Sequence, residues 1–414
     1  MHRGTQEIGG SCVEVEAGDG RRIVLDLGRP LGAAWGEPVE FPDIAGLRSP
    51  DPSLLGLLIS HPHADHYGLA ADLEVELPIY IGEEAARLLA AAVFFSPVSA
   101  TLDCAGYLRH REPFALGPFT ITPYLVDHSG FDAYSLLIEA DGQRLFYTGD
   151  LRAHGRKAAL FEQLLRDPPA SVDVLLMEGT HARIDGAHDE AIFETEAELE
   201  ERFVEACRAI EGAVVVFGSA QNLDRLVTVY RAAKRSDRLC VVDLYGATVA
   251  RATRETIPQP GFDALRVYVP QPQRVRVKES GEFHRVAAIA QCRVFPEALA
   301  GDPGRFLLHV PSSTAGELLR AGVLDPSALA VWSLWDGYLA EPSGIRLRAA
   351  LDAAGVPLVH LHTSGHASVT DLRRLVAELT PTRVVPIHSE AGDRYPELFP
   401  NVDRQADGIW WEAA

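Results

Sequence analysis

Short apolar runs separated by Gly, Pro and Asp dominate the first half of this chain. Short runs that are rich in apolar and β-branched side chains and are bounded by turn-forming residues are typical of β-strands. Runs of this kind lie at residues 11–16, 22–27, 54–60, 77–81, 119–126, 135–140, 144–148 and 172–177. Few stretches between them have helical spacing, so the pattern predicts a β-rich first half.

The pattern changes near residue 190, where stretches with helical spacing begin to alternate with apolar strands. Residues 213–217 form a continuous apolar run, and it is flanked by stretches with helical spacing at 194–210 and 223–234. Such alternation predicts a sheet covered by helices, so we interpret this middle block as a second, doubly wound domain. Beyond it we expect strands at 357–362 and 383–387, a helix at 370–379 and a short closing strand at 409–411.

The composition is that of a folded protein without membrane-spanning segments. With 414 residues, 47% of them hydrophobic and 23% charged, the chain is longer than one hydrophobic core usually supports. Its apolar runs are too short to cross a bilayer, and residues 1–10 lack the apolar segment of a secretory signal. The five cysteines are widely spaced, with no C-x-x-C pair, which favours a reducing compartment. We therefore expect a cytoplasmic protein with no membrane partner.

The formal net charge of −20 argues against a polyanionic partner, because phosphate contacts come mainly from Lys and Arg. Residues 190–350 weaken this argument, since their 19 basic and 21 acidic residues leave them nearly neutral. Basic residues of this block could contact a nucleic-acid backbone, although solvated surface charges are at least as common. The candidates are Arg225, Arg231, Arg274, Arg276 and Lys278.

Four metal-capable side chains leave the end of one predicted strand. The run at 54–59 is followed by Ser-His-Pro-His-Ala-Asp-His, which places His61, His63, Asp65 and His66 in one turn. Imidazole and carboxylate groups are zinc ligands, and an H-x-H-x-D-H run arises by chance in roughly one chain in a thousand of this composition. An ordinary surface loop is therefore the weaker interpretation, and such a turn can contribute to two metal sites.

Two zinc sites that keep a position open for water need more ligands than this turn supplies. His128 follows one predicted strand, and Asp150 follows another. Either residue alone would more often be an ordinary loop residue. Together with the turn at 61–66 they become candidates for the missing ligands.

These residues resemble the four ordered motifs of the metallo-β-lactamase fold, which begin with Asp26 in Leu-Asp-Leu-Gly and end with Asp150 in Thr-Gly-Asp. The resemblance implies an αββα sandwich in which Asp26 orients the ligands through hydrogen bonds, although a strand-end Asp is often structural. It also implies the ligand set: His61, His63 and His128 for one zinc ion, Asp65 and His66 for a second, and Asp150 between the two.

Three motifs in the second half resemble motifs A, B and C of the β-CASP family. Glu178 ends a predicted strand, His366 lies in His-Thr-Ser-Gly-His-Ala, and His388 lies in Val-Pro-Ile-His-Ser-Glu. Residues 4–10 and 218–226 are similar to segments of ribonuclease J proteins. The fold class implied is α/β, with a β-CASP domain inserted into the metallo-β-lactamase sandwich. The domains would be 1–189 and 351–414 for the sandwich and 190–350 for the insert.

The resemblance implies a zinc-dependent phosphodiesterase that cleaves RNA by attack of a metal hydroxide on phosphorus. Two Zn²⁺ ions per chain are expected, with Mn²⁺ or Mg²⁺ as alternatives. Asp65 belongs to the catalytic set, His388 completes the second metal site, and His366 donates a proton to the leaving oxygen. Glu178, also in the catalytic set, would hold His366 or another imidazole in its tautomer, although a Glu at a strand end is often structural. His362 and Ser364 would contact a substrate phosphate.

Other interpretations stay open at this point. A DNA-directed β-CASP nuclease is the nearest alternative, although DNA-specific relatives tend to have Val rather than His at the position of His388. A hydrolase of thioesters or lactones with the same fold would lack the insert, and a metal-free scaffold would not need the full ligand set. The sequence leaves open the choice between RNA and DNA, between endonucleolytic and exonucleolytic cleavage, and between a monomer and a homodimer.

Overall fold

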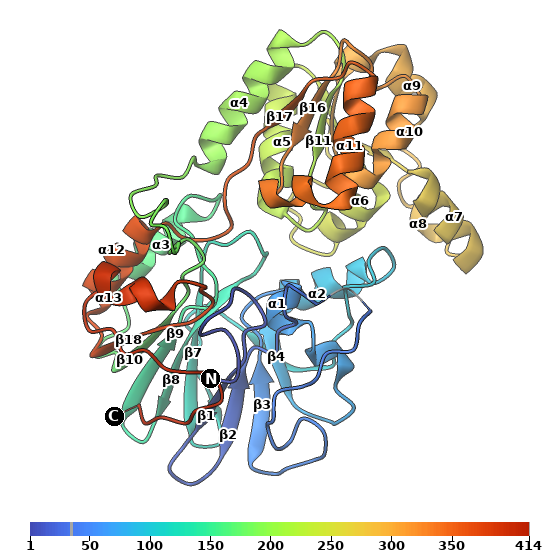
Figure 1. Cartoon of the computed structure of the whole chain (residues 1–414). Coiled ribbons are helices and arrows are strands. Elements are labelled where there is room, and N and C mark those ends of the chain that lie inside the picture. Colours follow the sequence, from blue (N-terminus) through green and yellow to red (C-terminus); the bar gives the residue numbers. More distant parts are fainter. Residues whose placement is uncertain (34–35, 414) are drawn as a thin grey trace. The chain divides into compact units, whose positions relative to one another are not determined.

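A computed structural model of the chain describes residues 1–33 and 36–413. It divides into two compact units, and Figure 1 labels many of their helices and strands. The first unit contains residues 1–193 and 365–414, and the second contains residues 194–364. The second unit is thus inserted between two segments of the first.

The first unit contains two β-sheets. In sheet order, the strands of the five-stranded sheet are β1 (Val13–Glu16), β2 (Arg22–Leu25), β3 (Leu54–Leu58), β4 (Ile79–Gly82) and β5 (Cys104–Leu108). Those of the six-stranded sheet are β18 (Arg383–Pro386), β10 (Val174–Met177), β9 (Gln143–Tyr147), β8 (Tyr134–Ala140), β7 (Phe119–Leu125) and β6 (Phe114–Leu116). Strands β1 and β2 are antiparallel, and so are the neighbouring pairs β9–β8, β8–β7 and β7–β6. All other neighbouring strands in these two sheets are parallel.

Side chains alternate between the two faces of each sheet, and both faces contribute hydrophobic residues to a core. In β10, Val174 and Leu176 join the core between the two sheets, whereas Leu175 and Met177 join a core on the outer face. Successive side chains of a strand point to opposite faces, so a strand that is apolar at every position must be covered on both sides. All four residues of β10 are buried, as this rule requires.

Helices cover the outer faces of both sheets. Residues of α2 pack with β2 and β3, and residues of α3 and α12 pack with β9 and β10. The layers are therefore helix, sheet, sheet and helix, which confirms the predicted αββα sandwich. The helices of this unit are α1 (Ala64–Tyr67), α2 (Glu83–Ala92), α3 (Ala158–Arg166), α12 (Val369–Leu379) and α13 (Tyr395–Leu398), with short 3₁₀ turns at Ala70–Asp72 and Gly392–Arg394.

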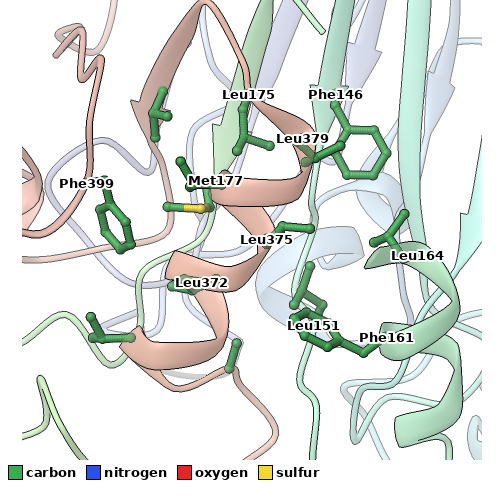
Figure 2. Packing of buried hydrophobic residues seen from close by; sticks show 14 of the residues in the cluster. Phe146, Leu151, Phe161, Leu164, Leu175, Met177, Leu372, Leu375, Leu379 and Phe399 are labelled. Atoms are coloured by element: carbon green, nitrogen blue, oxygen red, sulfur yellow. The ribbon is translucent and has the colours of Figure 1, made fainter. Parts of the chain in front are cut away.

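Helix α12 shows how the sequence specifies one of these layers. The Ser368 hydroxyl accepts a hydrogen bond from the Asp371 amide, which caps the first turn. Leu372, Leu375 and Leu379 follow at helical spacing and are buried. Figure 2 shows these leucines beside Phe161 and Leu164 of α3, facing the sheet residues Phe146, Leu175 and Met177.

The second unit contains a seven-stranded sheet in which every pair of neighbours is parallel. This confirms the inserted α/β domain of the predicted fold. In sheet order, the strands are β14 (Arg293–Val294), β13 (Leu265–Tyr268), β12 (Leu239–Asp243), β15 (Phe306–Val310), β11 (Val214–Phe217), β16 (Leu329–Trp332) and β17 (Leu358–His360). The helices are α4 (Glu196–Ala209), α5 (Leu223–Arg235), α6 (Leu244–Arg251), α7 (Gln271–Ser280), α8 (His284–Ala287), α9 (Pro296–Gly301), α10 (Ala315–Arg320) and α11 (Pro342–Ala353), with 3₁₀ turns at Pro303–Arg305, Ser312–Thr314 and Asp336–Ala340.

The structure differs from the sequence-based expectation at the end of the insert and in residues 409–411. Strand β17 pairs with β16, so the compact second unit extends to residue 364, beyond the boundary at 350 placed from the sequence. Residues 409–411 do not form a strand, and the side chains of Ile409 and Trp410 are exposed. An apolar run predicts a strand only where a neighbouring strand is available to pair with it.

Arg225, one of the candidates for contact with a nucleic-acid backbone, does not lie on the surface. Its side chain is fully buried in the second unit, and its Nη2 lies 3.0 Å from the Glu196 carboxylate. The Thr228 hydroxyl donates a second hydrogen bond to this carboxylate, at 2.6 Å. A buried charge needs a paired partner, so Arg225 holds α4 and α5 together and is not available to a ligand on the surface.

The packing of α12 gives a prediction for stability. Replacing Leu375 with Ala removes a buried side chain between α12 and the sheet, which should lower the free energy of unfolding by about 2–5 kcal/mol. Glu378→Ala, at an exposed position of the same helix, should change it by no more than about 0.5 kcal/mol. Urea titrations followed by circular dichroism measure both. Equal midpoints for the two variants would contradict the packing described above.

Candidate metal centre

The metal-capable residues lie where strands of the first unit end. His61 follows β3 after Ser60, and the chain then turns into α1, which has His63 as its N-cap and contains Asp65 and His66. Loops at the carboxyl ends of strands are the usual place for functional side chains in α/β folds. Residues 61–66 carry four of these side chains because α1 begins at Ala64, only a few residues after β3 ends at Leu58.

The first cluster consists of His61, His63 and His128, whose nearest ligand atoms all lie within 4.8 Å of one another. His128 Nε2 lies 3.1 Å from His63 Nδ1. Two nitrogens bound to one tetrahedral zinc ion would be about 3.3 Å apart. His128 Nδ1 donates to the Gly365 carbonyl at 2.5 Å, which leaves Nε2 directed toward the cluster.

Electrostatics favour the neutral, ligand form of these imidazoles. Burial lowers the pKa of His61 well below its usual value, and the neighbouring His66 and His128 lower it further. Burial likewise lowers the pKa of His128, with His63 as the next contribution. Zinc binds neutral imidazole, so both side chains are prepared for coordination at neutral pH.

The second cluster consists of Asp65, His66 and His388, again within 4.8 Å. His388 Nε2 lies 3.3 Å from Asp65 Oδ2. Asp150 adjoins both clusters, because its Oδ2 lies 3.1 Å from His66 Nε2 and 3.6 Å from His61 Nε2. The structure therefore brings all seven predicted ligands together, with Asp150 in the position between two sites.

The hydrogen-bonding state of the clusters fits bound metal ions. Among the described residues, the buried atoms that have no hydrogen-bond partner include His61 Nε2, His66 Nε2 and both carboxylate oxygens of Asp150. Buried polar atoms are normally hydrogen-bonded because leaving them unsatisfied costs free energy. A nitrogen and oxygen donor set that converges in this way is what zinc requires.

Asp26 holds His66 in a fixed orientation. Its Oδ2 accepts hydrogen bonds from His66 Nδ1 at 2.7 Å, from the Ser60 hydroxyl at 2.7 Å and from the Tyr147 hydroxyl at 2.6 Å. Burial lowers the pKa of His66, but Asp150 and Asp26 outweigh burial and raise it well above the usual value. Asp26 thus directs Nε2 of His66 toward Asp150.

Gly28 is a residue that the sequence reasoning did not select. A Cβ at this position would lie 1.7 Å from the Asp65 carbonyl oxygen, so only glycine allows the turn that carries Asp65 to approach β2. The Gly28 amide donates to the Ser11 carbonyl, and the Ser11 amide donates to the Asp65 carbonyl. The only sequence signal was the glycine two residues after Asp26.

Glu178 and His366 lie beside the two clusters. Glu178 is fully buried at the end of β10, and its Oε2 lies 3.4 Å from His366 Nδ1. Burial lowers the pKa of His366, but Glu178 and Asp150 outweigh it and raise the value to about 9. His366 Nδ1 is 3.7 Å from Asp150 Oδ2, and the His366 and His388 rings are stacked at 5.5 Å. Ligand-type atoms of Asp150, Glu178, His366 and His388 likewise all lie within 4.8 Å of one another.

His362 and Ser364 belong to the second unit and follow β17. Burial lowers the pKa of His362 to about 3, with Arg225 and His360 as further contributions. A neutral His362 is a weaker partner for a phosphate than a cationic one. The contact of His362 and Ser364 with a substrate phosphate stays a prediction.

Two family models match the chain. Residues 33–218 match the beta-lactamase superfamily domain, and residues 358–394 match the Zn-dependent metallo-hydrolase RNA specificity domain. The chain belongs to the metallo-β-lactamase superfamily. In the part of the chain that the structure describes, no helix is long and apolar enough to span a membrane.

Distant relatives over most of the chain are ribonuclease J proteins. The protein of Sinorhizobium meliloti is 22% identical over 86% of this chain and 61% of its own length, and that of Mycobacterium tuberculosis is 25% identical over 93% and 67%. The chain thus spans about two thirds of these relatives or less. A crystal structure of a protein of unknown function from Enterococcus faecalis V583 has the same fold, with a TM-score of 0.77, 21% identity and coverage of 100% of this chain and 97% of the other.

The role of Asp26 gives a prediction for metal affinity. Asp26→Asn removes the charge and one acceptor oxygen from a site that receives three side-chain donors, so His66 should lose its fixed orientation. Loss of such a partner typically weakens metal binding by about 10–100-fold. Zinc competition with a chromophoric chelator measures this, with the exposed Asp19→Asn as control. Unchanged affinity in a folded Asp26→Asn protein would contradict the role assigned to Asp26.

Proposed function

We propose that this protein is a two-metal phosphodiesterase that cleaves RNA. Its distant relatives carry the name ribonuclease J, which describes such an enzyme. The observation that carries the proposal is the pair of adjacent clusters that share Asp150, with His366 beside them. Two metal ions that share a carboxylate are typical of enzymes that cleave phosphate esters. The match to an RNA specificity domain at residues 358–394 supports RNA as the substrate.

Each residue then has a task in the reaction. Bound metal ions supply Lewis acidity, lowering the pKa of water and offsetting charge on the phosphate. Asp65, His66 and His388 would hold one ion, and His61, His63 and His128 would hold the other. Asp150 touches both clusters and fixes their separation.

His366 is suited to donate a proton to the leaving 3′ oxygen. It lies between Glu178 and the cluster that contains His388, and one fifth of its side chain remains exposed. The Glu178 carboxylate, which also accepts from the Leu151 and Ala367 amides at 3.3 and 3.4 Å, is itself held rigidly. Glu178 therefore helps to orient Nδ1 of His366 and leaves Nε2 as the nitrogen that can reach a substrate.

The metal sites predict a stoichiometry. Purified protein reconstituted with Zn²⁺ at neutral pH should contain two equivalents per chain by elemental analysis, because the seven candidate ligands form two adjacent clusters of nitrogen and oxygen donors. Mn²⁺ should be able to replace Zn²⁺. A content below one equivalent of any transition metal would exclude the two-metal mechanism.

The different positions of His366 and His388 predict different defects. His366→Ala should leave the zinc content unchanged and reduce single-turnover RNA cleavage by about 10²–10⁴-fold, the usual contribution of a general acid. His388→Ala should lower the zinc content, because its Nε2 faces Asp65. His284→Ala, at an exposed position of α8, is the matched control. Exchanged phenotypes would show that the two roles had been assigned the wrong way round.

The substrate class is tested with matched 5′-labelled RNA and DNA of the same sequence. Preferential cleavage of RNA is expected, and preferential cleavage of DNA would favour the DNA-directed β-CASP alternative. If neither is cleaved by the zinc-loaded protein while a thioester or lactone is hydrolysed, and the hydrolysis requires His388, the phosphodiesterase proposal is wrong. The same assays applied to His366→Ala separate a role in phosphodiester cleavage from a general structural role.

A further inference from the structure

The Thr180 side chain lies between the two histidines to which different tasks have been given. Its hydroxyl oxygen is 3.1 Å from His366 Nδ1 and 3.0 Å from His388 Nδ1. Two imidazoles from motifs that are distant in sequence thus contact the same atom. No role for this side chain follows from the ligand set or from the proton donor alone.

The chemistry of the two rings fixes how the hydroxyl is used. If Nε2 of His388 is the ligand atom facing Asp65, it is deprotonated, and the ring's proton lies on Nδ1. His366 can donate from Nε2 and end as a neutral ring only if it keeps its other proton on Nδ1. A hydroxyl oxygen has two acceptor lone pairs, so Thr180 can accept from both Nδ1–H groups at once.

The backbone around Thr180 is held firmly enough to make this contact specific. The Thr180 amide donates to Glu178 Oε2 at 3.2 Å, and the Ser389 hydroxyl donates to the Gly179 carbonyl at 3.1 Å. A Cβ on Gly179 would lie 1.9 Å from the hydroxyl oxygen of the buried Tyr395. The turn after β10 is therefore fixed against the turn that carries His388, and the hydroxyl has little freedom to move away.

We propose that Thr180 is a positioning residue whose hydroxyl is the common acceptor for Nδ1 of His366 and Nδ1 of His388, setting both rings with Nε2 toward the reaction. The part of this inference that concerns His366 rests on the proposed nuclease function. The part that concerns His388 rests only on metal binding. One hydroxyl then couples the geometry of a metal ligand to that of the proton donor.

Thr180→Val tests the inference, because it replaces the hydroxyl with a methyl group of similar size. Glu178 still contacts Nδ1 of His366, and Asp150 Oδ1 remains 3.6 Å from Nδ1 of His388. The variant should therefore weaken the orientation of both rings without abolishing it. We expect zinc affinity at the weaker site, measured by chelator competition without substrate, to fall by about 10–100-fold. At saturating zinc, kcat for RNA should fall by about 10-fold or more while KM changes little.

Thr180→Ser keeps the acceptor and should remain within about threefold of the wild type in zinc affinity and kcat, a result that a packing role of the methyl group would not give. Thr120→Val, at an exposed position of β7, is the matched control. If Thr180→Val does not fold, Thr180→Ala takes its place as the variant without an acceptor.

Wild-type zinc affinity and kcat in the folded Val variant would overturn the proposal, and so would a Ser variant as impaired as Val. If the wild-type protein itself does not cleave RNA, the proposed function fails. The zinc competition still decides whether Thr180 positions His388.

Discussion

The buried carboxylate of Asp150 is the group on which the arrangement of the first unit depends. It is 2% exposed, and neither oxygen has a hydrogen-bond partner among the described residues. Burial raises its pKa, but His388 and His66 outweigh burial and hold the pKa well below the usual value. An ionised carboxylate in this environment is stable only when it is surrounded by compensating groups. The imidazoles of His66 and His388 provide part of this compensation, and bound metal ions would add to it.

The sandwich brings these groups to one place because the strands that carry them end on the same side. His61, His128 and Asp150 follow β3, β7 and β9, and Glu178 and His388 follow β10 and β18. The two strands of the last pair, β10 and β18, are parallel neighbours although some 200 residues separate them in sequence. The return of the chain after the second unit is what completes the site, since it supplies His366 and His388.

The sequence predicted what is local or what repeats with a regular period. The turn from His61 to His66 could be found because its ligands are close in sequence, and β10 could be found because it is apolar at every position. Contacts between distant segments could not be predicted from spacing. The boundary at residue 350 placed β17 outside the insert because a three-residue strand gives no indication of the strand with which it pairs.

Small residues at close contacts were missed for the same reason. Gly28 matters only because the backbone of Asp65 lies against it, and Thr180 matters only because two histidines meet at its hydroxyl. Neither contact leaves a pattern in one sequence. The candidate ligands could be selected because metal chemistry restricts their residue types and because their order resembles known motifs. Almost any residue type can form the contacts that orient a ligand.

Charge places a further constraint on how this protein could recognise a polyanion. Of the basic residues of the second unit proposed as backbone contacts, Arg225 is buried against Glu196, Arg231 is paired with Glu200 and Arg274 with Glu317. With a net charge of −20, long-range attraction cannot supply much of the binding free energy. Recognition of a phosphate would then depend on the metal ions, since they are the largest positive charges that the first unit could hold. The features that hold the metal ligands in place, such as Asp26 beneath His66, would therefore govern substrate binding as well as catalysis.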